Sequence, residues 1–232
     1  QTWMRVPETV QVVLHGTLQP WVGGKDLILY TIGQIGVSGA RYQTLEFAGP
    51  AVAALSIDGR LTMANMAIEA GAKAGLFAVD QATRDYVDRR ALRPYRVFQP
   101  DAGATYAKRI EIDASQLEPQ VAFPHLPDNV RPVSQAGEVR IDQAVIGSCT
   151  SGRLEDLRVA AEVLRGRRVH PDVRGIIIPG SQQVYLDAVR EGLVEKLPDL
   201  LDLRAKDLAR LEGIGDRSAG KLVEEIRAAA AV

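Results

Sequence analysis

The stretch from Ile141 to Arg158 constrains the fold more than any other part of the chain, because it reads as a strand, a turn and a helix. Residues 144–146 form an apolar run of the kind found in a buried strand. Gly147 and Gly152 bracket a turn in which the backbone must bend sharply. The apolar residues after the turn recur at helical spacing, and they are Leu154, Leu157, Val159, Ala160, Val163 and Leu164. The stretch therefore predicts a strand–turn–helix unit of an α/β protein.

The turn carries Cys149, the single cysteine of the 232 residues. Its predicted place is the carboxyl end of a strand beside a helix N-terminus, where open α/β sheets bind their ligands. A helix N-terminus also favours the thiolate form, which is the form that binds metal. The alternative is a buried and inert cysteine, because a free cysteine behaves as a small core hydrophobe.

Strands and helices alternate along the rest of the first 193 residues. The patterns predict strands at 9–15, 42–47, 71–79, 108–113, 144–146 and 173–179. They predict helices from Lys25 or Asp26 to Gly36, from a capping Thr62 to Gly71, over 83–92, over 154–164, and from a capping Ser181 onward. Asp58 and Gly59 are interpreted as a turn. This order predicts an α/β fold, a mostly parallel sheet with crossover helices.

Two of these strands are expected to lie side by side. Residues 144–146 and 176–178 are apolar on both faces, and one amphipathic helix joins them. Strands of that kind are typical of the buried centre of a parallel sheet, linked by a right-handed crossover. We therefore expect them to be adjacent, parallel and central.

Composition shifts suggest three segments. Residues 1–135 form an α/β domain that ends in a proline-rich connector, with prolines at 119, 124, 127 and 132. Residues 136–196 form a βαβα unit around the cysteine, and residues 197–232 form a helical tail. The chain begins at Gln1 rather than at a methionine, which suggests a fragment.

Charge and cysteine usage exclude several classes. The net charge is −1, so no global basic field indicates nucleic acid. A single cysteine cannot form a disulfide within the chain and fits a reducing compartment. No apolar run approaches the length of a membrane span, and no signal pattern opens the chain. We therefore expect a cytoplasmic protein without a membrane contact.

Several segments share a resemblance to one family. Residues 147–157 resemble the first cluster-cysteine motif of the aconitase superfamily, and within it the large subunits of 3-isopropylmalate dehydratases and homoaconitases. The matching segments elsewhere are 6–9, 39–40, 46–49, 62–75 and 123–134, and the resemblance extends to Leu193.

This resemblance implies a hydro-lyase that removes and re-adds water on a hydroxy di- or tricarboxylic acid, as in leucine biosynthesis. It implies a [4Fe-4S] cluster with Cys149 as one ligand, and a small swivel-domain subunit as the partner. Glu46 would be a catalytic residue that handles the water or hydroxyl at the exposed iron. Without the resemblance, the favoured interpretation of Glu46 is a solvated or ion-paired carboxylate at a strand end.

The chain departs from the family pattern at two places. Ser151 stands where the family motif has an asparagine, which puts a polar contact beside the cluster in doubt. The expected Cys-x-x-Cys pair after Leu193 is absent from the sequence. Because one thiolate cannot hold such a cluster, we expect the chain alone to be inactive.

The segment after Leu193 instead resembles a helix-hairpin-helix unit of bacterial NAD-dependent DNA ligases. Gly213 and Gly215 would form a hairpin whose backbone N–H groups approach a phosphate at a helix N-terminus. Arg217 and Lys221 add positive charge there. The alternative is a pair of helices that only packs against the sheet.

Three hypotheses follow from these patterns. The first is an incomplete or chimeric hydro-lyase of the isopropylmalate/homoaconitate type. The second is a module that binds duplex DNA weakly and without sequence preference through its hairpin. The third is a designed α/β protein without activity, because two unrelated resemblances meet near residue 193.

Overall fold

The structure is a computed structural model and describes residues 3–193. Its main sheet contains four parallel strands in the order β3-β2-β1-β4. They are β1 (Thr9–His15), β2 (Thr44–Ala48), β3 (Ala74–Phe77) and β4 (Lys108–Asp113). The expected mostly parallel α/β fold is therefore confirmed.

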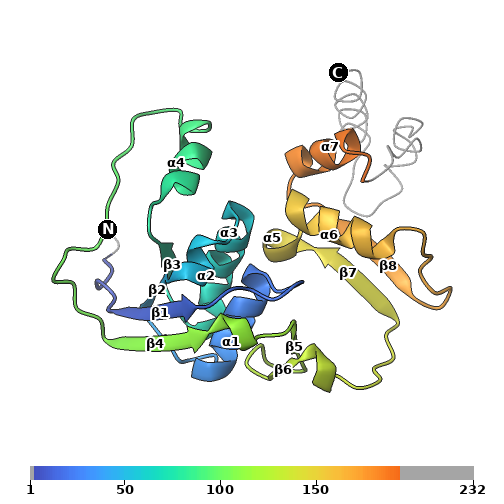
Figure 1. Ribbon diagram of the computed structural model, residues 1–232, viewed down its shortest axis with the longest axis horizontal. Coiled ribbons are helices and arrows are strands. Elements are labelled where there is room, and N and C mark those ends of the chain that lie inside the picture. Colours follow the sequence, from blue (N-terminus) through green and yellow to red (C-terminus); the bar gives the residue numbers. More distant parts are fainter. Residues whose placement is uncertain (1–2, 194–232) are drawn as a thin grey trace. The chain divides into compact units, whose positions relative to one another are not determined.

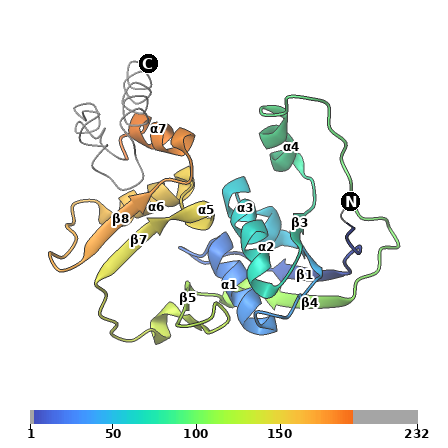
Figure 2. The ribbon, with the colours of Figure 1, turned by 180° about the vertical axis from the view of Figure 1, so that it is seen from behind.

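Three helices lie against one face of this sheet, in front of its strands in Figure 2. They are α1 (Gly24–Ile35), α2 (Pro50–Ala53) and α3 (Ile57–Met66), and α3 continues into a 3-10 turn, η1 (Ala67–Ala70). The core forms where their apolar sides meet those of the strands. Its largest buried side chains include Val10, Val12, Leu14, Leu27, Ile28, Ile32, Leu45, Phe47 and Met63.

Helix α1 follows the sequence prediction closely. Its N-terminus is capped from within, because the Gly23 N–H donates to Asp26 Oδ2 over 2.8 Å. Its C-terminus ends at Gly36, whose φ of 80° suits glycine and whose N–H donates to the Ile32 carbonyl oxygen. Asp26 Oδ1 also accepts from the Gln120 N–H, so one carboxylate ties the helix to the later connector.

The chain reverses direction across the sheet after β3. Helix α4 (Gln81–Asp88) and an irregular segment lead from β3 at one edge to β4 at the other (Figure 1). The strands β1, β2 and β3 are thus added in one direction, and β4 is added on the opposite side of β1. This order is that of a doubly wound sheet with its switch point between β1 and β4.

The connector holds two short strands that the proline pattern does not predict. β5 (Gln120–Ala122) and β6 (Val130–Pro132) pair antiparallel. Two 3-10 turns flank them, η2 (Ala114–Gln116) and η3 (Val133–Gln135).

The cysteine-bearing unit contains β7 (Gln143–Gly147), α5 (Ser148–Ser151), α6 (Leu154–Leu164), β8 (Arg174–Ile178) and α7 (Gln182–Arg190). β7 and β8 are adjacent and parallel, as predicted. Their predicted central, buried position is wrong in the described residues, because they form a separate two-stranded sheet. Val145 is 54% exposed and Ile178 is 53% exposed, since no third strand or second helical layer covers them there.

Two local predictions in the first half are also wrong. Asp58 and Gly59 do not form a turn but lie in the first turn of α3, whose N-cap is Ser56. The Ser56 hydroxyl accepts from the Gly59 N–H over 3.0 Å, so the helix starts five residues before Thr62. Thr62 lies inside the helix, where its hydroxyl is free to bond elsewhere.

Other predictions concern ends and boundaries. The Ser181 cap is confirmed, because its hydroxyl accepts from the Val184 N–H. The domain boundaries at 135 and 196 stay predictions. The predicted C-terminal hairpin, with Gly213, Gly215, Arg217 and Lys221, lies outside the described residues. Among the helices of residues 3–193, none combines the length and apolar character that crossing a bilayer requires.

Candidate functional site

Glu46 lies on the sheet face opposite the helices α1 to α3. Its neighbours Leu45 and Phe47 are buried in the core, and alternation along β2 turns Glu46 to the other side. In the parallel register Glu46 stands beside Gln11 of β1 and Leu76 of β3. On this face of the sheet, β2 therefore places one half-buried carboxylate between a polar and an apolar neighbour.

Two side chains bond the Glu46 carboxylate. Gln11 Nε2 donates to Oε1 over 3.0 Å, and the Tyr106 hydroxyl donates to the same oxygen over 2.8 Å. Donating this bond to Glu46 raises the pKa of Tyr106 above its usual value, because ionised Tyr106 would lose the bond and face the carboxylate charge without a proton between them. Glu46 is therefore fixed in a polar group of three side chains.

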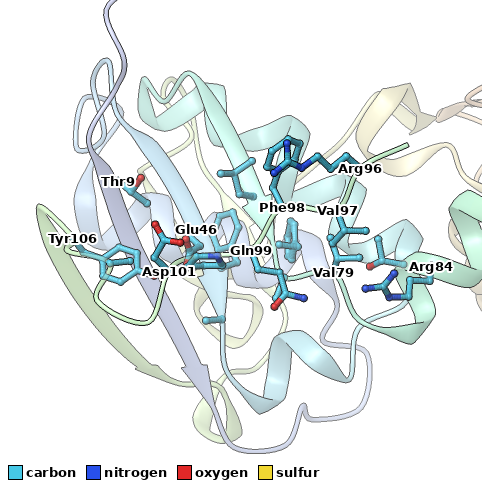
Figure 3. Close-up of a pocket in the computed structure, with 18 of the residues that line it drawn as sticks. Thr9, Glu46, Val79, Arg84, Arg96, Val97, Phe98, Gln99, Asp101 and Tyr106 are labelled. Atoms are coloured by element: carbon cyan, nitrogen blue, oxygen red, sulfur yellow. Dashed lines mark hydrogen bonds between the residues drawn. The ribbon is translucent and has the colours of Figure 1, made fainter. Parts of the chain in front are cut away.

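A cavity of about 660 Å³ opens beside this group. It lies between the Glu46 face of the sheet and a cover made of α4 and the segment 95–106. Figure 3 shows Glu46 and Tyr106 at one side of it and Arg84 at the other. Apolar side chains line the space between, and they include Leu76, Val79, Val87, Val97 and Phe98. The cavity can thus take a ligand with both polar and apolar parts.

Cys149 lies where the sequence predicts it, after the carboxyl end of β7 and before α6. Its side chain is exposed, so the interpretation as a buried core cysteine is wrong. The turn depends on glycine: a Cβ at Gly152 would lie 2.7 Å from the Ser148 carbonyl oxygen and 2.9 Å from the Gly180 nitrogen. The Gly180 N–H donates to the Gly152 oxygen over 2.6 Å, which joins the turn to the segment after β8.

Helix α3 holds the main chain of the cysteine turn. Thr62 Oγ1 donates to the Thr150 carbonyl oxygen over 2.8 Å, and Asn65 Nδ2 donates to the Cys149 carbonyl oxygen over 3.0 Å. Thr62 and Asn65 are three residues apart, so both project from one side of the helix. These bonds connect residues more than 80 positions apart in the sequence.

Two basic side chains also bond the turn, one from α1 and one from the turn itself. Lys25 Nζ donates to Ser151 Oγ over 2.9 Å, and Arg153 Nη2 donates to the Cys149 carbonyl oxygen over 3.3 Å. The Arg153 N–H in turn donates to Asp156 Oδ2 over 2.9 Å and caps α6. Burial raises the pKa of Asp156. The turn is therefore fixed by its main chain, and the thiol itself stays exposed.

The structure does not bring Glu46 and Cys149 together in one site. Cys149 does not line the cavity beside Glu46, and the two residues share no hydrogen-bond partner among residues 3–193. The side chains that sequence reasoning missed are Gln11 and Tyr106. Strand alternation and parallel pairing could have indicated Gln11, whereas no pattern marks Tyr106 in its irregular segment.

The residues present do not by themselves fit an iron–sulfur cluster. Such a cluster is held by several cysteine thiolates, and this chain contains one cysteine. Within residues 3–193, no three His, Cys, Asp or Glu side chains gather closely enough to hold a metal ion. Any cluster bound at Cys149 therefore needs ligands from outside these 232 residues.

Comparison with known proteins decides the family. The model of the aconitase family (aconitate hydratase) matches residues 1–139 and 134–201. The chain belongs to the aconitase family. It is 61% identical over 194 residues to the 3-isopropylmalate dehydratase large subunit of Moorella thermoacetica, covering 84% of this chain and 46% of that protein. The corresponding subunit of Halothermothrix orenii is 58% identical over 194 residues, with the same coverage.

A third large subunit, from Desulfitobacterium hafniense, is 56% identical over 196 residues, which cover 84% of this chain and 47% of that protein. The chain thus spans about half the length of the curated relatives it matches. The resemblance expected from Glu46, Cys149 and their neighbouring residues is confirmed at the level of the family.

Proposed function

We propose that the chain is part of a hydro-lyase of the 3-isopropylmalate dehydratase/homoaconitase type. Such an enzyme dehydrates and rehydrates a hydroxy di- or tricarboxylic acid. The observation that carries the proposal is the Glu46 carboxylate, which is held by two donors at the wall of a cavity in a chain of this family. A fixed carboxyl group can give a proton to the hydroxyl group that leaves as water in dehydration, and as a carboxylate it can take a proton from water in rehydration.

The chain supplies only part of the machinery for this reaction. Glu46 is proposed as the carboxylate that exchanges a proton with the substrate hydroxyl or with water. Cys149 is proposed as one thiolate toward the [4Fe-4S] cluster that the family implies, and a small subunit is the proposed partner. Because one thiolate does not hold a cluster, we expect the isolated chain to be inactive.

A graft into a complete relative tests the proposal. The matched 194-residue segment of the Moorella thermoacetica large subunit is replaced by the matching part of this chain, and the product is combined with the small subunit. Dehydration of 3-isopropylmalate is followed by ultraviolet absorbance of the unsaturated product. An active graft supports the proposal.

Two variants of the graft assign the residues. Glu46→Gln should lower kcat by about 100-fold or more, because general acid–base catalysis contributes that much. Cys149→Ser should lower the iron content of the assembled enzyme. An iron-loaded graft without activity, or a Glu46→Gln graft as active as the unsubstituted one, would contradict the proposal.

A further inference from the structure

The two hydrogen bonds on Glu46 fall on the same oxygen. Gln11 Nε2 and the Tyr106 hydroxyl both donate to Oε1, over 3.0 and 2.8 Å. An ionised carboxylate has two oxygens and about four acceptor positions in total. Among residues 3–193, no side chain or main-chain group donates to Oε2. The carboxylate is therefore bonded on one side and open on the other.

The two donors come from different parts of the fold. Gln11 stands beside Glu46 in the register of β1 and β2, so its position is set by the sheet. Tyr106 lies two residues before β4 and belongs to the segment that covers the cavity. One donor comes from the sheet and the other from the cover. Rotation of the Glu46 carboxylate about its Cγ–Cδ bond would therefore break both hydrogen bonds.

The surroundings of the group leave Oε2 to a ligand. No lysine or arginine within residues 3–193 forms an ion pair with Glu46. The neighbour of Glu46 on β3 is the apolar Leu76, which is 48% exposed and lines the same cavity. Figure 3 shows Glu46, Tyr106 and Thr9 on the same side of the cavity.

We propose that Gln11 and Tyr106 are positioning residues, which hold Oε1 of Glu46 so that Oε2 gives a proton to the leaving hydroxyl of the substrate in dehydration and takes one from water in rehydration. This inference rests on the proposed function of Glu46 and adds two residues to its site. A carboxylate that is already held in one orientation loses no further rotational freedom when the proton is transferred. The barrier to proton transfer is therefore lower than for a freely rotating carboxylate.

The orientation is tested first in the unmodified 232-residue chain. With ¹³C-labelled tyrosine, the ring resonances of the six tyrosines report their ionisation, and Tyr106→Phe identifies the signal of Tyr106. The pKa of Tyr106 should lie above that of free tyrosine, about 10, and should fall toward it in Glu46→Gln. Tyr95 is the internal control, because its hydroxyl donates to Asp88 and its pKa is also raised. It should not respond to Glu46→Gln.

The role in the reaction is tested in the active graft described above. Tyr106→Phe and Gln11→Leu should each lower kcat by about 10-fold with KM within about twofold, since each removes one hydrogen bond to a charged group. In the Glu46→Gln background, Tyr106→Phe should cause no further loss, because Tyr106 acts through Glu46. Tyr86→Phe, outside the cavity, is the control without effect.

The outcomes separate this inference from the proposed function. If the graft is inactive while Tyr106 responds to Glu46→Gln, the proposed function fails and the orientation of Glu46 stands. If the graft is active but Tyr106 does not respond, or if the losses from Tyr106→Phe and Glu46→Gln add, the positioning role is refuted.

Discussion

Arg60 is the most buried charged side chain among the described residues. Removing the negative charge of its partner Asp80 should lower the free energy of unfolding by a measurable amount. It lies on α3 with 5% of its surface exposed. Its guanidinium donates to both oxygens of Asp80, over 2.8 and 2.7 Å, and also to Ala53 O and Thr83 Oγ1. This group joins α3, the end of α2 and the start of α4, so it holds the cover of the cavity to the helical layer.

Asp80→Asn removes the charge and keeps the shape. Asparagine still accepts the Thr83 N–H bond at the N-cap of α4, so the cap is retained. Removing one partner of a fully buried pair costs 3–5 kcal/mol, and an exposed pair is worth up to about 1 kcal/mol. Because Asp80 is 39% exposed, solvent screens part of the pair, and we expect a loss of about 2 kcal/mol. This corresponds to about 4–8 °C in Tm for a chain of this size.

The pH dependence gives a second signature. The Arg60 hydrogen bonds hold the pKa of Asp80 well below its usual range. A depressed pKa in the folded state contributes stability above the unfolded-state pKa, about 3.9, and this stability is lost as the pH falls toward the folded value. The difference between the unsubstituted chain and Asp80→Asn should therefore be full at pH 7 and shrink below about pH 4.

Urea unfolding followed by circular dichroism measures both effects. Asp85→Asn on the same helix is the matched control, because within residues 3–193 Asp85 accepts only from Gln81. This change should alter the unfolding free energy by less than about 0.5 kcal/mol. Asp80→Ala should cost about 1 kcal/mol more than Asp80→Asn, since it also removes the cap. Equal stability of Asp80→Asn and the unsubstituted chain at pH 7 would refute the reasoning.

Cys149, Gly49 and the C-terminal glycines allow three further tests. Anaerobic iron–sulfur reconstitution should load well below one cluster per monomer, and a monomer carrying a full cluster contradicts this. Gly49→Ala should destabilise by at least about 2 kcal/mol in urea, because φ is 101° and a Cβ would lie 2.3 Å from a β1 oxygen, whereas Gly103→Ala should change little. Changing Gly213 and Gly215 to valine should abolish low-salt duplex DNA binding measured by fluorescence anisotropy; equal binding by both chains leaves the hairpin without a DNA role.

The strands and most helices could be predicted because local patterns determine them. The alternation of Val10, Val12 and Leu14 marks β1, and the glycine at 36 ends α1 where the chain needs a positive φ. The start of α3 could not be placed correctly, because Asp58 and Gly59 favour a turn by residue type. The Ser56 cap and packing of α3 against the sheet outweigh that preference.

The candidate site was only partly predictable for a different reason. Glu46 and Cys149 lie in motifs that are continuous in the sequence, so a resemblance identifies them. Tyr106 lies 60 residues from Glu46, in a segment without periodicity, and only the folded chain brings the two together. The burial of β7 and β8 was inferred from their apolar residues, whereas burial depends on neighbouring layers that a strand's own sequence does not specify.

The departure at Ser151 leaves the cysteine turn attached to the helices α1 and α3. The family motif has asparagine at this position, and both serine and asparagine carry an oxygen that accepts hydrogen bonds. Here Ser151 Oγ accepts from Lys25 Nζ over 2.9 Å, so the cysteine turn remains attached to the first turn of α1. Thr62 and Asn65 bond main-chain oxygens, which are independent of the side chain at position 151. The attachment of the Cys149 turn therefore does not require an asparagine at position 151.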